Sequence, residues 1–156
     1  MILDLGSINV KAELSKPEKI GKIQSLESSD LDDELVAEFI SRPEQLGRVI
    51  IGRNKHYYSS GAFDLVQLVL YVLKQTGPAH VLLASYSVGD RTITRLKHCL
   101  EVGEILSIRF LIDNRVRTIS PKPFDHMLTA FPGCVRCRTL HAKVALIWNE
   151  RFCIDI

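Results

Sequence analysis

The sequence lacks any long apolar run and any basic, apolar N-terminus. No stretch approaches the ~18–20 consecutive apolar residues that a membrane-spanning helix needs. The first residues, Met1-Ile2-Leu3-Asp4, lack the positive charge and the apolar stretch of a secretory signal. Internal repeats and low-complexity tracts are also lacking, and a length of 156 residues fits one domain. We therefore expect a single-domain cytoplasmic protein with no membrane partner.

Cysteine is scarce, with four residues in the chain. Without a secretion signal, reduced thiols are the default state. Cys134 and Cys137 form a C-x-x-C, with His141 four residues on, but a tetrahedral zinc site needs a fourth ligand and no spacing here is typical of one. A structural zinc and a redox pair remain as alternatives. We expect no metal and no cofactor, and we expect Cys99, in a helix, and Cys153, in a strand, to lie in the core.

The small net charge of +2 hides an asymmetry along the chain. Residues 1–41 hold four basic and nine acidic residues, a net charge of −5, whereas residues 42–156 hold 16 and nine, a net charge of +7. A basic body suits a polyanionic partner such as nucleic acid. The alternatives are a solvated surface with scattered arginines and an acidic segment that masks the basic face. We expect an acidic N-terminal segment over 1–41 with one helix, followed by an α/β domain over 42–156.

The N-terminal third gives weak structural signals. Ser29 or Asp30 can cap a helix whose early acidic residues suit the positive end of the helix dipole. In order, we expect a short strand or arm at 2–10, a polar loop at 11–29, a helix over 31–40 that Pro43 ends, and a short strand at 48–52.

The rest of the chain alternates strand and helix patterns. The continuous apolar run at 79–86 indicates a central strand that is covered on both faces. The other expected elements are helices at 62–74 (started by Ser59-Ser60-Gly61), 92–100 (capped by Asp90) and 123–131, strands at 105–113 and 134–139, and a hairpin of 141–148 with 151–156. This order predicts an α/β fold with a mixed, mostly parallel sheet flanked by helices and a C-terminal β-hairpin.

His141 and Lys143 are the candidate catalytic pair. On a strand, side chains two positions apart point to the same face, so the two would lie together at the start of an apolar strand. A buried Lys is costly without an anion nearby, and phosphate is the obvious partner. The alternative is a His that caps the strand and a Lys that extends from it to water.

Polar residues also follow the two apolar strands upstream. Functional groups in such sheets collect at the carboxyl ends of strands. Ser85 and Ser87 lie at the end of the strand at 79–86, while Asp113 ends the strand at 105–113 and Arg115 follows it. If the strand that begins at His141 runs antiparallel to these two, its start lies beside their ends. The four residues are then candidates for binding a phosphate, although serine and aspartate are also common in ordinary turns.

The H-x-K pair and its context resemble the phospholipase D superfamily. The resemblance covers roughly residues 60–156, with a helix, Val81–Ser87, a second helix, Phe110–Asp113 and then His141-Ala142-Lys143 before a hairpin. It implies a phospholipase D-like fold and phosphodiester cleavage without a metal, through a phosphohistidine intermediate. His141 would be the nucleophile or the acid, and Lys143 would hold the phosphate.

The chain departs from the family pattern at two places. Trp148 stands where the family motif has an Asp, and the family's later Gly-Ser pair and Asn would fall beyond Ile156. The family reaction needs two motifs and this chain has one, so the second would come from a homodimer partner or from downstream sequence. The resemblance favours a metal-independent nuclease. The alternative is a catalytically inactive nucleic-acid-binding module on the same scaffold.

Overall fold

The computed structural model describes residues 33–35, 40–50, 53–56, 59 and 61–156. The chain divides into two compact units, one formed by residues 1–35 with 52–56 and the other by residues 36–51 with 57–156. In the smaller unit, β1 (Asp33–Leu35) pairs in parallel with β2 (Asn54–His56). The boundary that we expect at residue 41 remains a prediction.

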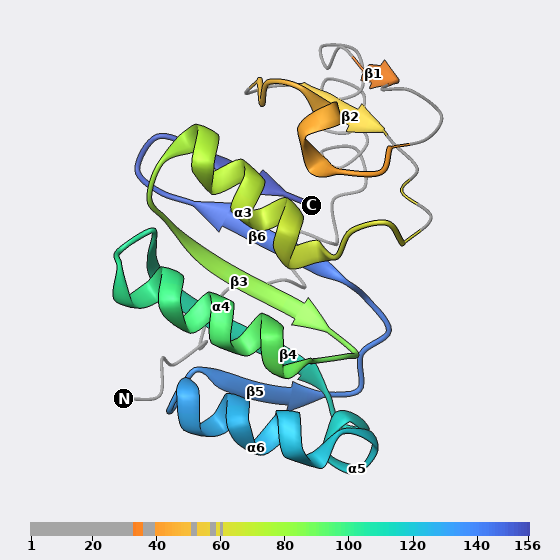
Figure 1. The fold of residues 1–156 in the computed structure, drawn as a ribbon, viewed down its shortest axis with the longest axis vertical. Coiled ribbons are helices and arrows are strands. Elements are labelled where there is room, and N and C mark those ends of the chain that lie inside the picture. Colours follow the sequence, from red (N-terminus) through yellow and green to blue (C-terminus); the bar gives the residue numbers. More distant parts are fainter. Residues whose placement is uncertain (1–32, 36–39, 51–52, 57–58, 60) are drawn as a thin grey trace, which may run out of the picture. The chain divides into compact units, whose positions relative to one another are not determined.

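The larger unit is built on a five-stranded mixed sheet with the order β5-β4-β3-β6-β7 (Figure 1). The strands are β3 (Ala79–Ser85), β4 (Ile105–Asp113), β5 (Val135–Arg138), β6 (Val144–Trp148) and β7 (Cys153–Asp155). The helices are η1 (Pro43–Leu46), α3 (Leu65–Thr76), α4 (Asp90–Glu101), α5 (Val116–Ile119) and α6 (Pro121–Ala130). The expected α/β fold with a mixed sheet and a C-terminal hairpin is confirmed.

The direction of β6 positions the candidate site. β3, β4 and β5 pair in parallel, whereas β6 runs antiparallel to β3 and β7 runs antiparallel to β6. Ala84, near the end of β3, pairs with Val144, the first residue of β6. The residues just before β6 therefore lie beside the residues that follow β3.

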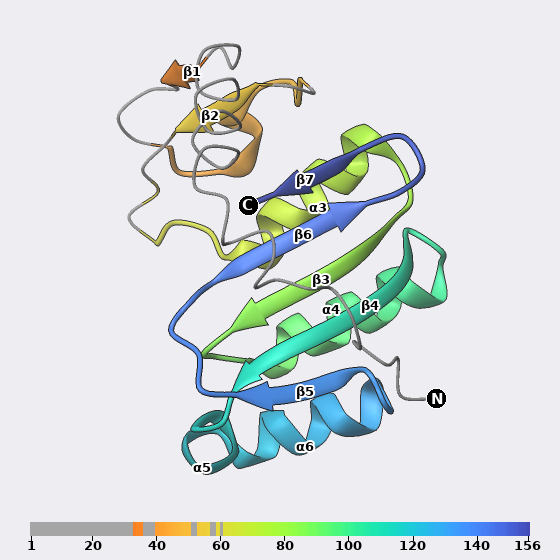
Figure 2. The ribbon, with the colours of Figure 1, turned by 180° about the vertical axis from the view of Figure 1, so that it is seen from behind.

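The described helices α3, α4 and α6 cover one face of this sheet, as the two opposite views show (Figures 1 and 2). Side chains on that face are buried, among them Val81, Leu83 and Ile147, whereas His80 and Leu82 on the other face are half-buried. The expectation of a sheet between helices, with β3 covered on both faces, is therefore wrong for the described residues. An apolar run does not distinguish full coverage from coverage of one face.

Capping explains where α3 begins. The Asp64 carboxylate accepts a hydrogen bond from the Gln67 backbone N–H, and the Gln67 side chain accepts one from the Asp64 N–H, both at 2.8 Å. This reciprocal pair satisfies two backbone donors at the start of the helix. The helix therefore begins at Leu65, three residues after the expected start at Ala62. It ends at Thr76 and is followed by Gly77, whose φ of 85° favours glycine.

The remaining elements of the larger unit differ from expectation by a few residues. α4 begins at Asp90 with Gly89 as its cap, so Asp90 is the first helical residue rather than the cap. α6 begins at Pro121, two residues before Pro123, and the short helix α5 was not expected. β6 begins at Val144, so the H-x-K residues precede the strand instead of opening it.

The expectations for the N-terminal third are largely wrong where the structure describes them. Residues 33–35, expected in a helix, form β1, and residues 48–50, expected in a strand, have no regular structure. The partner of β1 lies at 54–56, about 20 residues away, and a local pattern of caps and charges does not contain such a pairing. The expected arm at 2–10 and loop at 11–29 lie outside the described residues.

The cysteines divide between core and surface. Cys99 is buried in α4 as expected, and burial, followed by a hydrogen bond with Glu104, raises the pKa of its thiol to about 11. Cys153 is exposed on β7, so its expected place in the core is wrong. Among the described residues, no cluster of three His, Cys, Asp or Glu side chains is arranged to hold a metal ion. None of the helices described has the length and apolar character needed to cross a bilayer.

Candidate phosphate site

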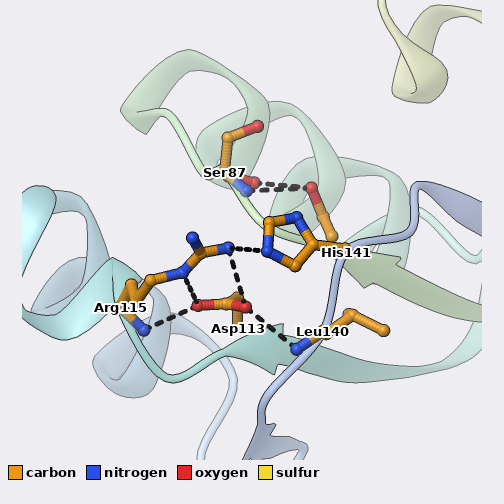
Figure 3. A network of polar contacts seen from close by, with 6 residues as sticks. Ser87, Asp113, Arg115, Leu140 and His141 are labelled. Atoms are coloured by element: carbon orange, nitrogen blue, oxygen red, sulfur yellow. Dashed lines mark hydrogen bonds and ion pairs between the residues drawn. The ribbon is translucent and has the colours of Figure 1, made fainter.

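Three segments that are distant in sequence meet at one edge of the sheet. Residues 85–87 begin at the last residue of β3, residues 113–115 begin at the last residue of β4, and residues 141–143 precede β6 (Figure 3). The meeting follows from topology, because the parallel strands β3 and β4 end at the same edge and the antiparallel strand β6 begins there. All six candidate residues belong to these segments.

Asp113 is the buried anchor of the site, with 1% of its surface exposed. Its Oδ1 accepts hydrogen bonds from the Arg115 backbone N–H and Nε, both at 2.8 Å. Its Oδ2 accepts from Arg115 Nη2 at 3.2 Å and from the Leu140 backbone N–H at 2.9 Å. The Arg115 side chain, followed by the two backbone donors, holds the pKa of the Asp113 carboxyl well below its usual range. The carboxylate thus fixes Arg115 and the backbone before His141, and as an anion it does not itself suit a phosphate.

This anchor makes the stability of the fold sensitive to acid. The folded-state pKa of Asp113 lies below its ordinary unfolded value of about 3.9, so the folded state binds fewer protons in that range. The stability that this carboxylate contributes is fully present above its unfolded-state pKa and is lost as the pH falls through its folded-state pKa.

We expect Asp113→Asn to lower the urea midpoint of unfolding at pH 7. We expect the difference in midpoint between the variant and wild type to narrow between pH 5 and pH 2.5. Asp125→Asn, at an exposed position on α6, is the control and should change stability by less than about 0.5 kcal/mol. A gap of equal size at every pH would contradict the role of this ionised carboxylate.

Arg115 joins the anchor to His141. Its Nη2 lies 3.0 Å from His141 Nε2 (Figure 3). A guanidinium has only donors, so Nε2 must be the acceptor and the proton of the ring is on Nδ1. The imidazole in this arrangement is therefore neutral, and the nitrogen with the free electron pair is the one that faces Arg115.

Tyr86 brings Lys143 and His141 to one place. The Lys143 Nζ lies 5.0 Å from the centroid of the Tyr86 ring, a cation–π contact. The ring of His141 lies 6.5 Å from the same ring, centroid to centroid. All three side chains are exposed, so the H-x-K pair is open to solvent. Sequence reasoning missed Tyr86, although its place between Ser85 and Ser87, directly after β3, is the same signal that selected the two serines.

Ser85 and Ser87 form a local turn. The Ser85 hydroxyl donates to the Ser87 carbonyl at 2.8 Å, and its oxygen accepts from the Ser87 backbone N–H at 3.2 Å. The Ser85 hydroxyl is therefore hydrogen-bonded to the backbone. This is the ordinary turn that was the alternative to a phosphate contact. The turn places Tyr86 and Ser87 at the mouth of the site.

The assembled site is cationic around a neutral imidazole. Arg115 and Lys143 supply two positive charges, and Asp113, which is almost fully buried, balances one of them from below. Two such cations are the kind of groups that form charge-assisted hydrogen bonds with a phosphate. No family model, curated protein or solved structure matches this chain, so the interpretation of the site depends on its own geometry.

Proposed function

We propose that the protein is a phospholipase D-like phosphodiesterase whose substrate phosphate binds between Arg115 and Lys143 and reacts with His141. The observation that supports this most directly is the 3.0 Å contact from Arg115 Nη2 to His141 Nε2, since it fixes a neutral imidazole beside a guanidinium. Neutral imidazole is the form that can act as a nucleophile. The basic charge of residues 42–156 favours nucleic acid as the phosphodiester.

In the proposed reaction, Arg115 exchanges partners. A phosphate oxygen is an anionic acceptor and competes with the neutral Nε2 for the guanidinium. When Arg115 turns to the phosphate, the electron pair of Nε2 is free to attack phosphorus. The new P–N bond forms as the P–O bond to the leaving group breaks, and Lys143 and Arg115 neutralise the charge on the phosphoryl oxygens. Water then cleaves the P–N bond and restores the imidazole.

The leaving oxygen needs a proton that His141, acting as the nucleophile, does not supply. In the proposed scheme a second imidazole, in its protonated form, provides it and then takes a proton back from the water that cleaves the P–N bond. A two-fold homodimer would bring the His141 of each copy to a common site, since an isologous contact repeats the same residues from both sides. Downstream sequence is the other source that the resemblance allows.

The test is cleavage of bis(p-nitrophenyl) phosphate and of single- and double-stranded DNA in the presence of EDTA. We expect turnover to persist in the chelator, because the charges that neutralise the phosphate are side chains. Lys143→Met keeps the aliphatic stem and removes the charge, and it should lower kcat/KM about a hundredfold. Lys74→Met, at an exposed position in the last turn of α3, is the matched control. Equal activity of the Lys143 variant and the control would contradict the proposal.

A nucleic-acid-binding module without turnover is the second candidate function. It is supported by an open groove between β5 and α6, which is lined by Arg117, Arg136 and Arg138. Three arginines on one groove suit a chain of phosphates. In the same assay this candidate predicts DNA binding that weakens steeply with salt and no cleavage under any condition.

A further inference from the structure

A cavity of about 300 Å³ opens beside the candidate site, on the helix-covered face of the sheet. Lys143, Ser85 and Ser87 line it together with the beginning of α4, so the cavity and the phosphate site share residues. Its other walls are mainly apolar residues that come from β3, β4, α4 and the beginning of α3. The most buried of these are Leu83, Ile93, Leu96, Phe110 and Ile112, each with at most 5% of its surface exposed.

The cavity is open to solvent where Ser87 and Lys143 line it, and it is closed on the inner side by side chains of the core. An apolar hollow that opens next to convergent charged groups is the ordinary form of a small-molecule site. Lys143 connects the two parts, because it lines the cavity and its ammonium group lies over the Tyr86 ring.

We propose that the cavity receives a compact apolar group, a single ring or a short alkyl chain, that is esterified to the phosphate held at Lys143 and Arg115. This inference rests on the proposed phosphate site and gives it a ligand class, a small apolar ester, that differs from the nucleic acid favoured by the charge of residues 42–156. The apolar walls favour burial of hydrocarbon and disfavour a nucleobase, whose polar edge would find few hydrogen-bond partners there. Asp64, the carboxylate among the lining residues, already accepts the Gln67 N–H at the start of α3.

The experiment compares phenyl phosphate with methyl phosphate by isothermal titration calorimetry. The two esters carry the same charged group and differ in the apolar group, so their affinity ratio reports the cavity alone. We expect phenyl phosphate to bind at least about tenfold more tightly, because the ring is removed from water. Thymidine 5′-phosphate, the nucleotide arm, should show no such advantage over methyl phosphate.

Substitutions on α4 give a matched pair. Thr92 lines the cavity and is half-buried, whereas Thr94 is exposed on the same helix. Thr92→Phe should fill the cavity and reduce the preference for phenyl phosphate to less than twofold, while the affinity for methyl phosphate is kept. Thr94→Phe should leave both affinities unchanged. Val88→Phe, at a second lining position, repeats the test if Thr92→Phe does not fold.

The outcomes separate the two proposals. A preference for phenyl phosphate that Thr92→Phe or Val88→Phe removes supports the cavity site, even if no phosphodiester is cleaved. Cleavage of phosphodiesters with equal affinity for the two esters overturns the cavity site and leaves the proposed reaction in place. Failure of both esters to bind, or a preference for phenyl phosphate that persists in both filled variants, also overturns the cavity site.

Discussion

Replacing His141 with alanine is expected to abolish phosphodiester cleavage while the protein remains folded. In the proposed reaction, the substitution removes the nitrogen that would form the bond to phosphorus, and loss of a nucleophile or its base costs about a thousandfold or more in kcat. The side chain is exposed and its hydrogen bond is to Arg115, so unfolding free energy should change by no more than about 1 kcal/mol. Initial rates on bis(p-nitrophenyl) phosphate with EDTA, together with urea unfolding of the same preparations, measure both quantities.

His98 provides the control for this experiment. It is exposed in the last turn of α4, away from the three segments of the site, so His98→Ala should retain full activity. The pair of variants distinguishes a specific imidazole from a general effect of losing a histidine. Cleavage by His141→Ala at the wild-type rate would show that the activity comes from other residues, and a wild type that binds DNA but never cleaves it would favour the binding module.

The largest expected effect on stability belongs to Phe131, at the end of α6. Its side chain is 1% exposed and its ring lies 4.9 Å from that of Phe110 on β4, centroid to centroid. Phe131→Ala removes this contact and leaves a cavity between α6 and the sheet, at a cost of about 3–5 kcal/mol. For a domain of this size, the melting temperature should fall by about 10 °C.

Thermal and urea unfolding of purified Phe131→Ala measure this cost. Ile119→Ala is the control, since Ile119 is 74% exposed on α5 and its truncation should change stability by less than about 0.5 kcal/mol. A loss below about 1 kcal/mol in Phe131→Ala would mean that α6 contributes little to the cooperative core.

The parallel strands and the hairpin were predictable because their signals are local. Ala79–Ser85 and Ile105–Asp113 are apolar runs bounded by glycines and polar turns, and β4 has the expected bounds. The expected hairpin needed only two short apolar runs separated by Asn149-Glu150. From these elements, the sequence predicted that His141 would lie beside the ends of β3 and β4 if its strand ran antiparallel to them, and β6 does pair antiparallel with β3.

The pairing of the N-terminal strands and the roles of individual site residues depend on contacts between segments that are distant in sequence, which a local sequence pattern does not contain. The pairing of β1 with β2 joins residues about 20 positions apart and displaced the expected helix. At the site, Asp113 was selected as a phosphate contact, whereas its four hydrogen bonds with Arg115 and Leu140 give it a positioning role. The role of Tyr86 depends on Lys143, 57 positions later, so only the folded arrangement shows it.

The placement of His141 and Lys143 just ahead of the C-terminal hairpin links ligand binding to local opening. If β6 detaches from β3, the imidazole and the ammonium group leave Arg115 and Tyr86, although the pairing among β3, β4 and β5 is kept. Any molecule that bridges these side chains therefore favours the closed hairpin, in proportion to its concentration over its dissociation constant. Binding of a ligand at these side chains and packing of β6 and β7 against β3 are therefore coupled. The affinity measured for a ligand includes the free energy of holding β6 in place.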